Sequence, residues 1–360
     1  MASSTSAPAA GVYGAEAMQG LVLRDQDMEK QASCPACGAG DRADFARHTF
    51  ADRRLQFVRC RQCSHVYLDP VPTQAWYDGL YAHSFWEAKT ETQQHQTVAA
   101  NRTQWRKGLQ RADKLIDALR GAGAVFPADG ALLEVGCSFG VIARRVAEAF
   151  GLRAHGIEPS VAARQFAERV AGVRIVAPTM SDLAARKETD GFCLIYFSHV
   201  LENIVDLDGT MALVREHLRD GGWLVIETPN IRFPPSYSIF HPNCFSPRSL
   251  GLLLRRHGLQ VARLSPSGRP ATRLSPRYLT AVAQKSEEHA GAEALKGGAP
   301  STDGLVMKTG HLWYRLASRP PLRLLDRWLT ARAYPTTPEQ RRALADIEAL
   351  AERQNQDATD

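Results

Sequence analysis

Four cysteines near the N-terminus have the spacing of a metal site. Cys34 and Cys37 form one Cys-x-x-Cys pair, Cys60 and Cys63 form a second, and 22 residues separate the pairs. Each pair holds two thiolates on a tight turn, and two such turns can place four sulfurs tetrahedrally around one ion. Because four thiolates leave no open coordination position, we predict a structural Zn²⁺ rather than a catalytic one.

A second segment has the pattern of a nucleotide-type cofactor loop. Residues 132–140, LLEVGCSFG, place Gly136 and Gly140 where an apolar strand turns into a helix, so the backbone can approach a ligand without a Cβ clash. The next strand ends at Glu158, whose carboxylate can accept hydrogen bonds from both hydroxyls of a ribose. An NAD-binding domain offers the same acid, so these residues alone leave dehydrogenase and methyltransferase open.

The glycine loop at 136–140 and the loop that begins at Glu158 need a parallel sheet to position them. From Ala131 onward, short apolar strands alternate with amphipathic helices, which is typical of a sheet covered on both faces. The predicted strands are residues 131–135, 153–158, 174–176, 192–197, 223–228, 259–264 and 278–284. The predicted fold class is α/β, with a doubly wound, seven-stranded Rossmann-like domain, an N-terminal zinc ribbon and helical extensions.

The rest of the chain divides around this domain. The predicted regions are a disordered tail at 1–31, a zinc ribbon at 32–72, a helical linker or cap at 73–121, the α/β domain at 122–286, and a linker with C-terminal helices at 287–360. Within them we predict ribbon strands at 55–60 and 66–68 and C-terminal helices near 312–333 and 338–355.

The composition indicates an ordinary folded protein. With 44% hydrophobic residues in 360, the chain can bury a substantial core. No stretch approaches the roughly 18 to 20 apolar residues of a membrane span, and the N-terminus lacks the pattern of a signal peptide. Paired cysteines fit a reducing compartment, so we expect a cytoplasmic protein. The net charge of +6 permits an anionic substrate but does not by itself indicate nucleic-acid binding.

Four segments resemble the successive motifs of class I S-adenosylmethionine-dependent methyltransferases. They are LLEVGCSFG, GIEPS at 156–160, FCLIYFSHVLENI at 192–204 and LRDGGWLVIETPN at 218–230. The HVLE and GGxLxIExPN elements distinguish the chain from dehydrogenases. With the cysteine-rich ribbon in front, residues 34–286 resemble the zinc-binding methyltransferases of sugar and secondary-metabolite clusters, including the deoxysugar nucleotide C-methyltransferases. The resemblance implies S-adenosylmethionine as the cofactor.

The resemblance also implies which residues bind that cofactor. Glu134 and the two loop glycines would surround its methionyl part, Glu158 its ribose, and Ser181 with Asp182 its adenine. The full set of cofactor-binding candidates is Glu134, Gly136, Cys137, Gly140, Glu158, Ser181, Asp182 and Ser198.

The candidates for acceptor chemistry are His241, His199, Glu202 and Tyr81. The segment 237–246, YSIFHPNCFS, aligns His241 with the histidine that, in the sugar C-methyltransferases, removes a proton next to a carbonyl, although Phe240 stands where that group commonly has an acid. His199 and Glu202 could orient the substrate or could cap a helix. Tyr81 belongs to an aromatic cluster that could line the acceptor site or pack helices. Arg102, Arg106, Lys107 and Arg111 recur at near-helical spacing and could meet a diphosphate or form a solvated basic face.

The resulting prediction is methyl transfer to a small molecule, such as a nucleotide-linked sugar or a glycan precursor, with transfer to carbon or oxygen left open. The alternatives are an RNA methyltransferase that uses the ribbon for binding and a non-catalytic cofactor-binding or scaffold protein. The sequence does not specify an oligomeric state.

Overall fold

The computed structural model describes residues 22–50, 53–81, 98–185, 191–233, 236–286 and 303–357. The predicted tail up to residue 21, the linker at 287–302 and part of the predicted cap at 82–97 lie outside these residues.

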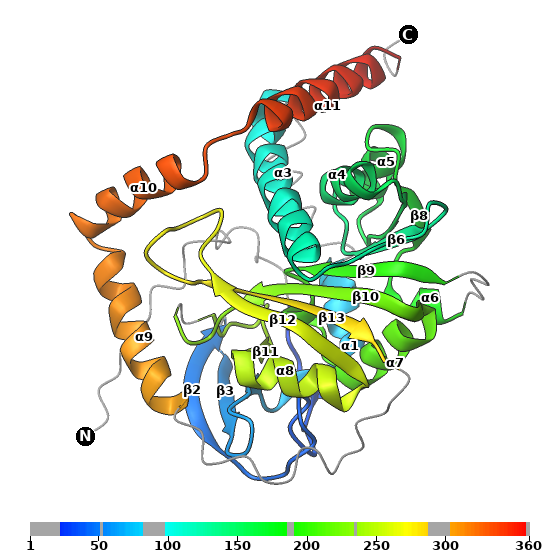
Figure 1. Cartoon of the computed structure of the whole chain (residues 1–360). Helices are drawn as coiled ribbons and strands as arrows, with labels where there is room; N and C mark the ends of the chain where they lie inside the picture. The colour runs from blue at the N-terminus through cyan, green and yellow to red at the C-terminus, as the bar shows by residue number, and fades with distance from the viewer. Residues whose placement is uncertain are drawn as a thin grey trace.

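The centre of the molecule is a seven-stranded sheet with the order β12-β13-β10-β9-β6-β7-β8 (Figure 1). Its strands are β6 (Ala131–Val135), β7 (Arg153–Ile157), β8 (Arg174–Ala177), β9 (Phe192–Ser198), β10 (Leu218–Pro229), β12 (Leu259–Ser267) and β13 (Tyr278–Lys285). Strands β6 to β10 are parallel, whereas β13 runs antiparallel to both β10 and β12. The seven predicted strands are confirmed, and the sheet is mixed rather than wholly parallel.

Helices cover both faces of this sheet, as the doubly wound prediction requires. One face packs against α3 (Val98–Gly121), α4 (Val141–Phe150) and α5 (Val161–Arg169), and the other against α7 (Leu207–His217) and α8 (Pro247–Arg256), with α6 (Met180–Ala184) beside α7. The apolar run of β9 is continuous because both faces of the strand are buried. Leu194 and Tyr196 pack on the face covered by α3, α4 and α5, while Ile195 and Phe197 pack on the face covered by α7 and α8.

The N-terminal module is a smaller, four-stranded antiparallel sheet with the order β11-β4-β3-β2. It consists of β2 (Arg42–Phe50), β3 (Arg53–Cys60), β4 (Val66–Leu68) and β11 (Asn243–Cys244). Beside it, β1 (Met28–Glu29), which follows η2 (Asp25–Asp27), pairs with β5 (Val71–Pro72), so the end of the predicted tail has regular structure. Strand β11 comes from the segment that follows β10 of the α/β domain. This domain therefore contributes one strand to the sheet of the N-terminal module. The sequence analysis did not predict this strand.

Three helices end the chain, and a short one follows the module. Helix α1 (Gln74–Gly79) leads from the small sheet toward α3. The predicted helix near 312–333 is two helices, α9 (Asp303–Ala317) and α10 (Leu322–Ala333), because Pro320 and Pro321 interrupt it. Helix α11 (Pro338–Asp357) crosses α3, where Leu344 and Ile347 pack on Trp105 (Figure 1). Within the described ranges, every helix is too short or too polar to cross a membrane.

Candidate active site and metal centre

A cavity of about 1420 Å³ lies at the carboxyl edge of the parallel strands, where the loops after β6, β7 and β9 meet. This edge is where open α/β sheets bind their ligands. A pocket for one small ligand usually measures roughly 300 to 1,000 Å³, so the cavity has room for a cofactor and an acceptor together. Ten of the twelve predicted cofactor and acceptor residues line it; Gly140 and Asp182 do not.

The turn after β6 has an unusual backbone that glycine makes possible. Gly136 has a φ of +73°, and a Cβ there would lie 2.5 Å from Cγ2 of Val200. Ser138 also has a positive φ, of 49°. Gly140 begins α4, and a Cβ there would lie 2.8 Å from the Val173 side chain. Gly136 therefore shapes the cavity wall, whereas Gly140 lets the start of α4 pack closely against the chain beneath it.

Replacing Gly136 with alanine should weaken cofactor binding at least 10-fold and destabilise the fold by roughly 1 to 3 kcal/mol, because the new methyl group meets Val200 and the φ is unfavourable. Calorimetric titration with S-adenosylhomocysteine and thermal unfolding measure both effects. Gly123→Ala is the matched control, since Gly123 has a φ of +74° and nothing within 4 Å of its Cβ position. Equal affinity in the two variants would rule out the steric contact as the cause.

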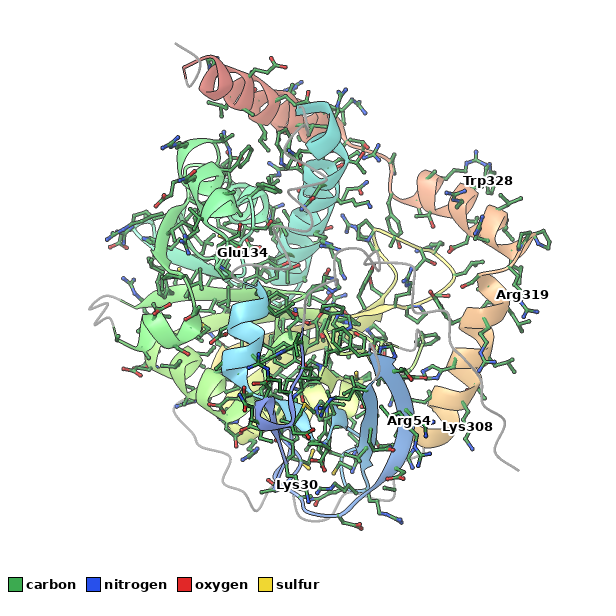
Figure 2. The ribbon with its side chains drawn as sticks, turned by 180° about the vertical axis from the view of Figure 1, so that it is seen from behind. Lys30, Arg54, Glu134, Lys308, Arg319 and Trp328 are labelled. Carbon is green, nitrogen blue, oxygen red and sulfur yellow. The ribbon has the colours of Figure 1, made fainter. Side chains whose placement is uncertain are left out.

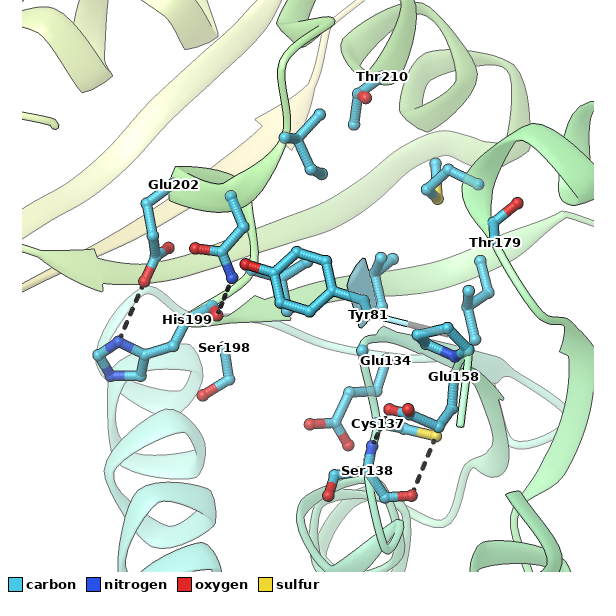
Figure 3. Close-up of a pocket in the computed structure, with 18 of the residues that line it drawn as sticks. Tyr81, Glu134, Cys137, Ser138, Glu158, Thr179, Ser198, His199, Glu202 and Thr210 are labelled. Atoms are coloured by element: carbon cyan, nitrogen blue, oxygen red, sulfur yellow. Dashed lines mark hydrogen bonds and ion pairs between the residues drawn. The ribbon is translucent and has the colours of Figure 1, made fainter. Parts of the chain in front are cut away.

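Two of the predicted cofactor ligands, Glu158 and Glu134, are buried carboxyl groups that line the cavity. Glu158 follows β7 and is 2% exposed; its Oε2 accepts a hydrogen bond from the Ser138 amide at 2.8 Å, and its Oε1 accepts one from the Ser160 amide at 2.9 Å (Figure 3). Glu134 is 1% exposed and accepts one from the Ala143 amide at 2.9 Å. Burial raises the pKa of Glu134 well above its usual range. The Ser138 and Ser160 amides hold Glu158 as an oriented hydrogen-bond acceptor, which the hydroxyls of a ribose would fit.

The other cofactor candidates have different surroundings. Ser198 and Ser181 line the cavity. Asp182 instead closes a capping box at the start of α6, where its Oδ2 accepts a hydrogen bond from the Thr179 hydroxyl at 2.8 Å. Cys137 lies against Gly156, at which a Cβ would come within 2.5 Å of its Sγ. Burial raises the pKa of the Cys137 thiol well above its usual range, so the side chain packs as a neutral group.

His199 lies between two carboxylates at the end of β9. It has a φ of 57°, its Nδ1 is 3.3 Å from Oε1 of Glu202, and its Nε2 is 3.3 Å from Oε1 of Glu227 (Figure 3). Burial lowers the pKa of His199, but its hydrogen bonds with the two carboxylates outweigh burial and raise the pKa above its usual value. Glu202 also accepts a hydrogen bond from the Thr228 hydroxyl at 3.1 Å. The two carboxylates thereby fix the His199 ring at the cavity wall.

Glu227 ties this pair to α3 and was missed by the sequence analysis. Its carboxylate lies 2.7 Å from Nζ of Lys114 and 3.9 Å from Nε of Arg111. Burial alone would raise the pKa of Glu227, but His199, Lys114 and Arg111 lower it to about 2. Arg111 and Lys107 line the cavity, whereas Arg102 pairs with Glu348 on α11, so the predicted basic stripe does not form one uniform surface. The glutamate in the IETPN segment was the available signal for this network.

Acid should destabilise the fold through Glu227. Its pKa of about 2 lies below the ordinary 4.5, so this contribution is present above about pH 4.5 and is lost as the pH falls through about 2, amounting to about 3 kcal/mol. His199 acts oppositely, because a raised pKa gives stability that is lost as the pH rises. In denaturant unfolding across acidic pH, Glu227→Gln should flatten the acid limb, and Glu168→Gln, at an exposed site, should not. Parallel curves for wild type and Glu227→Gln would contradict this assignment.

The predicted base His241 lines the cavity and has a defined tautomer. Its Nδ1 lies 2.8 Å from the carbonyl oxygen of Ser236. Because a carbonyl can only accept, Nδ1 carries the proton of the neutral ring and Nε2 is the proton acceptor. The preceding residues are held by two tyrosines: Tyr77 donates to the Ile239 carbonyl at 2.5 Å and Tyr81 to the Phe240 carbonyl at 3.4 Å. Figure 3 shows the ring of Tyr81 among the residues that line the cavity.

The four paired cysteines form one buried cluster. The Sγ atoms of Cys34 and Cys63 are 3.6 Å apart, as are those of Cys37 and Cys60, and all four lie within 4.8 Å of one another. A tetrahedron with Zn–S bonds of about 2.3 Å has edges of about 3.8 Å, so the sulfurs fit Zn²⁺. Contacts among the thiols raise the pKa of Cys34 and Cys63 and lower that of Cys37 and Cys60. The cluster could hold zinc.

A buried hydrogen-bond chain connects this cluster to the His241 loop. His65 follows the second knuckle, and its backbone N–H donates to Sγ of Cys63 at 3.4 Å. Its Nε2 lies 2.9 Å from Oδ1 of Asn243, whose Nδ2 donates to the Ile204 carbonyl at 2.6 Å. Burial lowers the pKa of His65 to about 4, so the ring is neutral and donates from Nε2. Asn243 thus joins the metal module to the turn η4 (Leu201–Asn203) and to the His241 loop.

Comparison with known proteins supports the α/β domain specifically. Residues 105–264 match the model of a family described as a methyltransferase domain. No curated protein matches the sequence. Among solved structures, geranyl diphosphate C-methyltransferase from Streptomyces coelicolor A3(2) is 18% identical over 49% of this chain and 77% of its own, with a TM-score of 0.39. The glycopeptide N-methyltransferase MtfA is 17% identical (49% and 93%, TM-score 0.39), and an S-adenosylmethionine-dependent methyltransferase from Mesorhizobium loti is 18% identical (47% and 96%, TM-score 0.36).

The family match covers the parallel strands β6 to β10, the glycine turn after β6 and the buried acid after β7, and it ends before β13. Residues 105–264 are therefore an S-adenosylmethionine-dependent methyltransferase domain, and a four-cysteine cluster lies near the N-terminus of the chain. At these identities and scores, the solved structures say nothing of its acceptor.

Proposed function

We propose that the protein transfers a methyl group from S-adenosylmethionine to a small-molecule acceptor, with His241 as the general base. The observation that carries the proposal is the hydrogen bond between His241 Nδ1 and the Ser236 carbonyl, since it leaves Nε2 as a proton acceptor on a residue that lines the cavity. A base oriented in this way can take a proton from a C–H beside a carbonyl or from a hydroxyl.

When bound, S-adenosylmethionine would supply an electrophilic methyl group, which is attacked in line by the acceptor's nucleophile while the C–S bond breaks and neutral S-adenosylhomocysteine leaves. Glu158 would hold the ribose hydroxyls, and Glu134 would face the positive charge of the methionyl part. His241 would accept the acceptor's proton at Nε2, while the Ser236 carbonyl stabilises the resulting imidazolium through Nδ1–H. His199 and Glu202, which line the cavity, would form a fixed polar wall beside the acceptor.

The proposed acceptor is a nucleotide-linked sugar or a related glycan precursor. Two features support this class. The four-cysteine module in front of the methyltransferase domain is the arrangement that resembles the sugar methyltransferases. Lys107 and Arg111 also line the cavity, where they can meet a diphosphate. Incubation with S-adenosylmethionine carrying a labelled methyl group, against a panel of nucleotide-linked sugars with and without a carbonyl, tests the class and separates carbon from oxygen transfer.

Replacing Glu158 with alanine should weaken the binding of S-adenosylhomocysteine about 100-fold, because two charge-assisted hydrogen bonds to the ribose are lost. Glu158→Gln should lose less, since the amide keeps one acceptor. Calorimetric titration gives the affinity, and Glu168→Ala, which removes an exposed carboxylate from α5, is the control. Unchanged affinity in Glu158→Ala would remove this residue from the proposed cofactor site.

A further inference from the structure

Exposed apolar side chains are concentrated on the two helices α9 and α10. Among the described residues, the large hydrophobic side chains on these helices that remain exposed are Leu312 (57%), Trp313 (40%), Leu316 (45%), Leu324 (58%), Leu325 (45%) and Trp328 (54%). Each helix carries its three at positions i, i+1 and i+4, a spacing that places them on one side of a helix. We call these six residues the α9–α10 apolar face.

This face is open although both helices are attached to the rest of the protein. On α9, Met307 is buried and the His311 ring hydrogen-bonds to the Ile231 carbonyl at 2.6 Å. On α10, Asp326 accepts hydrogen bonds from the Thr272 hydroxyl at 2.6 Å and the Leu274 amide at 2.9 Å. The Trp313 indole N–H also donates to the Leu274 carbonyl at 3.0 Å, so Trp313 lies at the border of the apolar face. The other five side chains are at least 45% exposed.

The two helices that carry the apolar face are positively charged, and their arginines are exposed. Residues 312–333 contain five arginines, namely Arg315, Arg319, Arg323, Arg327 and Arg332, and one acid, Asp326, so their net charge is 5 − 1 = +4, against +6 for the whole chain. Asp326 is engaged by the loop beneath it. The Arg332 guanidinium lies over the Trp328 ring, 4.5 Å from its centroid. Figure 2 shows Lys308, Arg319 and Trp328 along the outer margin of these helices.

The positive charge of α9 and α10 distinguishes between two kinds of binding partner for the apolar face. A second copy of the chain docked by a twofold axis would place arginines against arginines, with Asp326 already used, and such a contact is unfavourable. Leucine and tryptophan side chains on helices with exposed arginines instead match a surface that is apolar inside and negatively charged outside. We propose that the α9–α10 apolar face binds the surface of an anionic lipid bilayer. The helices lie in the interface and do not cross it, because neither is long or apolar enough to span the bilayer.

Co-sedimentation of the full-length, zinc-loaded protein with lipid vesicles tests the proposal. Wild type should bind vesicles of phosphatidylcholine containing about 30 mol % phosphatidylglycerol, bind pure phosphatidylcholine at least 10-fold more weakly, and dissociate as salt is added. The double variant Leu325→Glu/Trp328→Glu should lose at least 10-fold in binding. Val161→Glu, at a residue 58% exposed on α5, is the matched control and should bind as wild type does.

A second pair of variants separates charge from apolar contact. Arg323→Gln/Arg327→Gln should weaken binding to the anionic vesicles about 10-fold or more and leave the weak binding to neutral vesicles unchanged. Folding of every variant is verified by its affinity for S-adenosylhomocysteine, whose cavity does not include these residues. Absence of wild-type binding to anionic vesicles at low salt would overturn the proposal. So would a wild-type dimer in solution that the Leu325→Glu/Trp328→Glu variant abolishes, since that would assign the face to a second copy.

Discussion

Replacing His241 with alanine should lower kcat by a factor of about 100 to 10,000, which is the usual contribution of a positioned general base. The dissociation constant for S-adenosylhomocysteine should change by less than about threefold, because the cofactor side of the cavity is built from the ends of β6 and β7 rather than from the His241 loop. Single-turnover methyl transfer to the acceptor, combined with calorimetric titration, measures the two effects separately.

Two controls distinguish loss of the base from loss of structure. Added imidazole should restore part of the activity of His241→Ala, because it can occupy the space left by the ring and accept the proton. His48→Ala removes a histidine from β2 outside the cavity lining and should leave kcat unchanged. A wild-type kcat in His241→Ala would show that His241 is not the general base.

Removing the metal should have the second large effect. Structural zinc sites contribute about 10 kcal/mol or more to folding, so chelation should greatly lower the thermal stability of the N-terminal module. Because β11 is a strand of the module's sheet, loss of the module also releases the His241 loop, and methyl transfer should fall together with the zinc content. Metal analysis, thermal unfolding and kcat on the same samples test this. Full activity in metal-free protein would contradict the claim that the module positions the His241 loop.

A single substitution can test the connection without removing the metal. Asn243→Ala leaves the buried His65 ring and the Ile204 carbonyl without their partner, at a cost of roughly 2 to 4 kcal/mol for two lost hydrogen bonds. Zinc content should stay at one ion per chain while kcat falls about 10-fold. A variant with normal kcat would show that the asparagine stabilises the fold but does not position the acceptor loop.

The sequence predicted those features that depend on residues close together in the chain. The two Cys-x-x-Cys pairs each make a knuckle within four residues, so their spacing was sufficient to predict the cluster. Likewise, the apolar runs of β6 and β9 and the glycine turn after β6 are local patterns, and all were placed correctly.

The features that the sequence did not predict depend on contacts between distant residues. Strand β11 has only two residues, and it is a strand because Asn243 pairs with Tyr67 of β4. The charge network joins Lys114 of α3 to Glu227 of β10, and Lys114 sits in what reads as an apolar stripe. The capping role of Asp182 likewise follows from the short length of α6 rather than from any motif. Such pairings have no local signature, because tertiary packing decides them.

The central claim is that the cavity binds S-adenosylmethionine, and calorimetric titration of the zinc-loaded wild-type protein tests it most directly. We expect S-adenosylhomocysteine to bind at one site per chain with a dissociation constant on the order of micromolar, and NAD not to bind. Absence of S-adenosylhomocysteine binding, or tighter binding of NAD at the same site, would contradict the account.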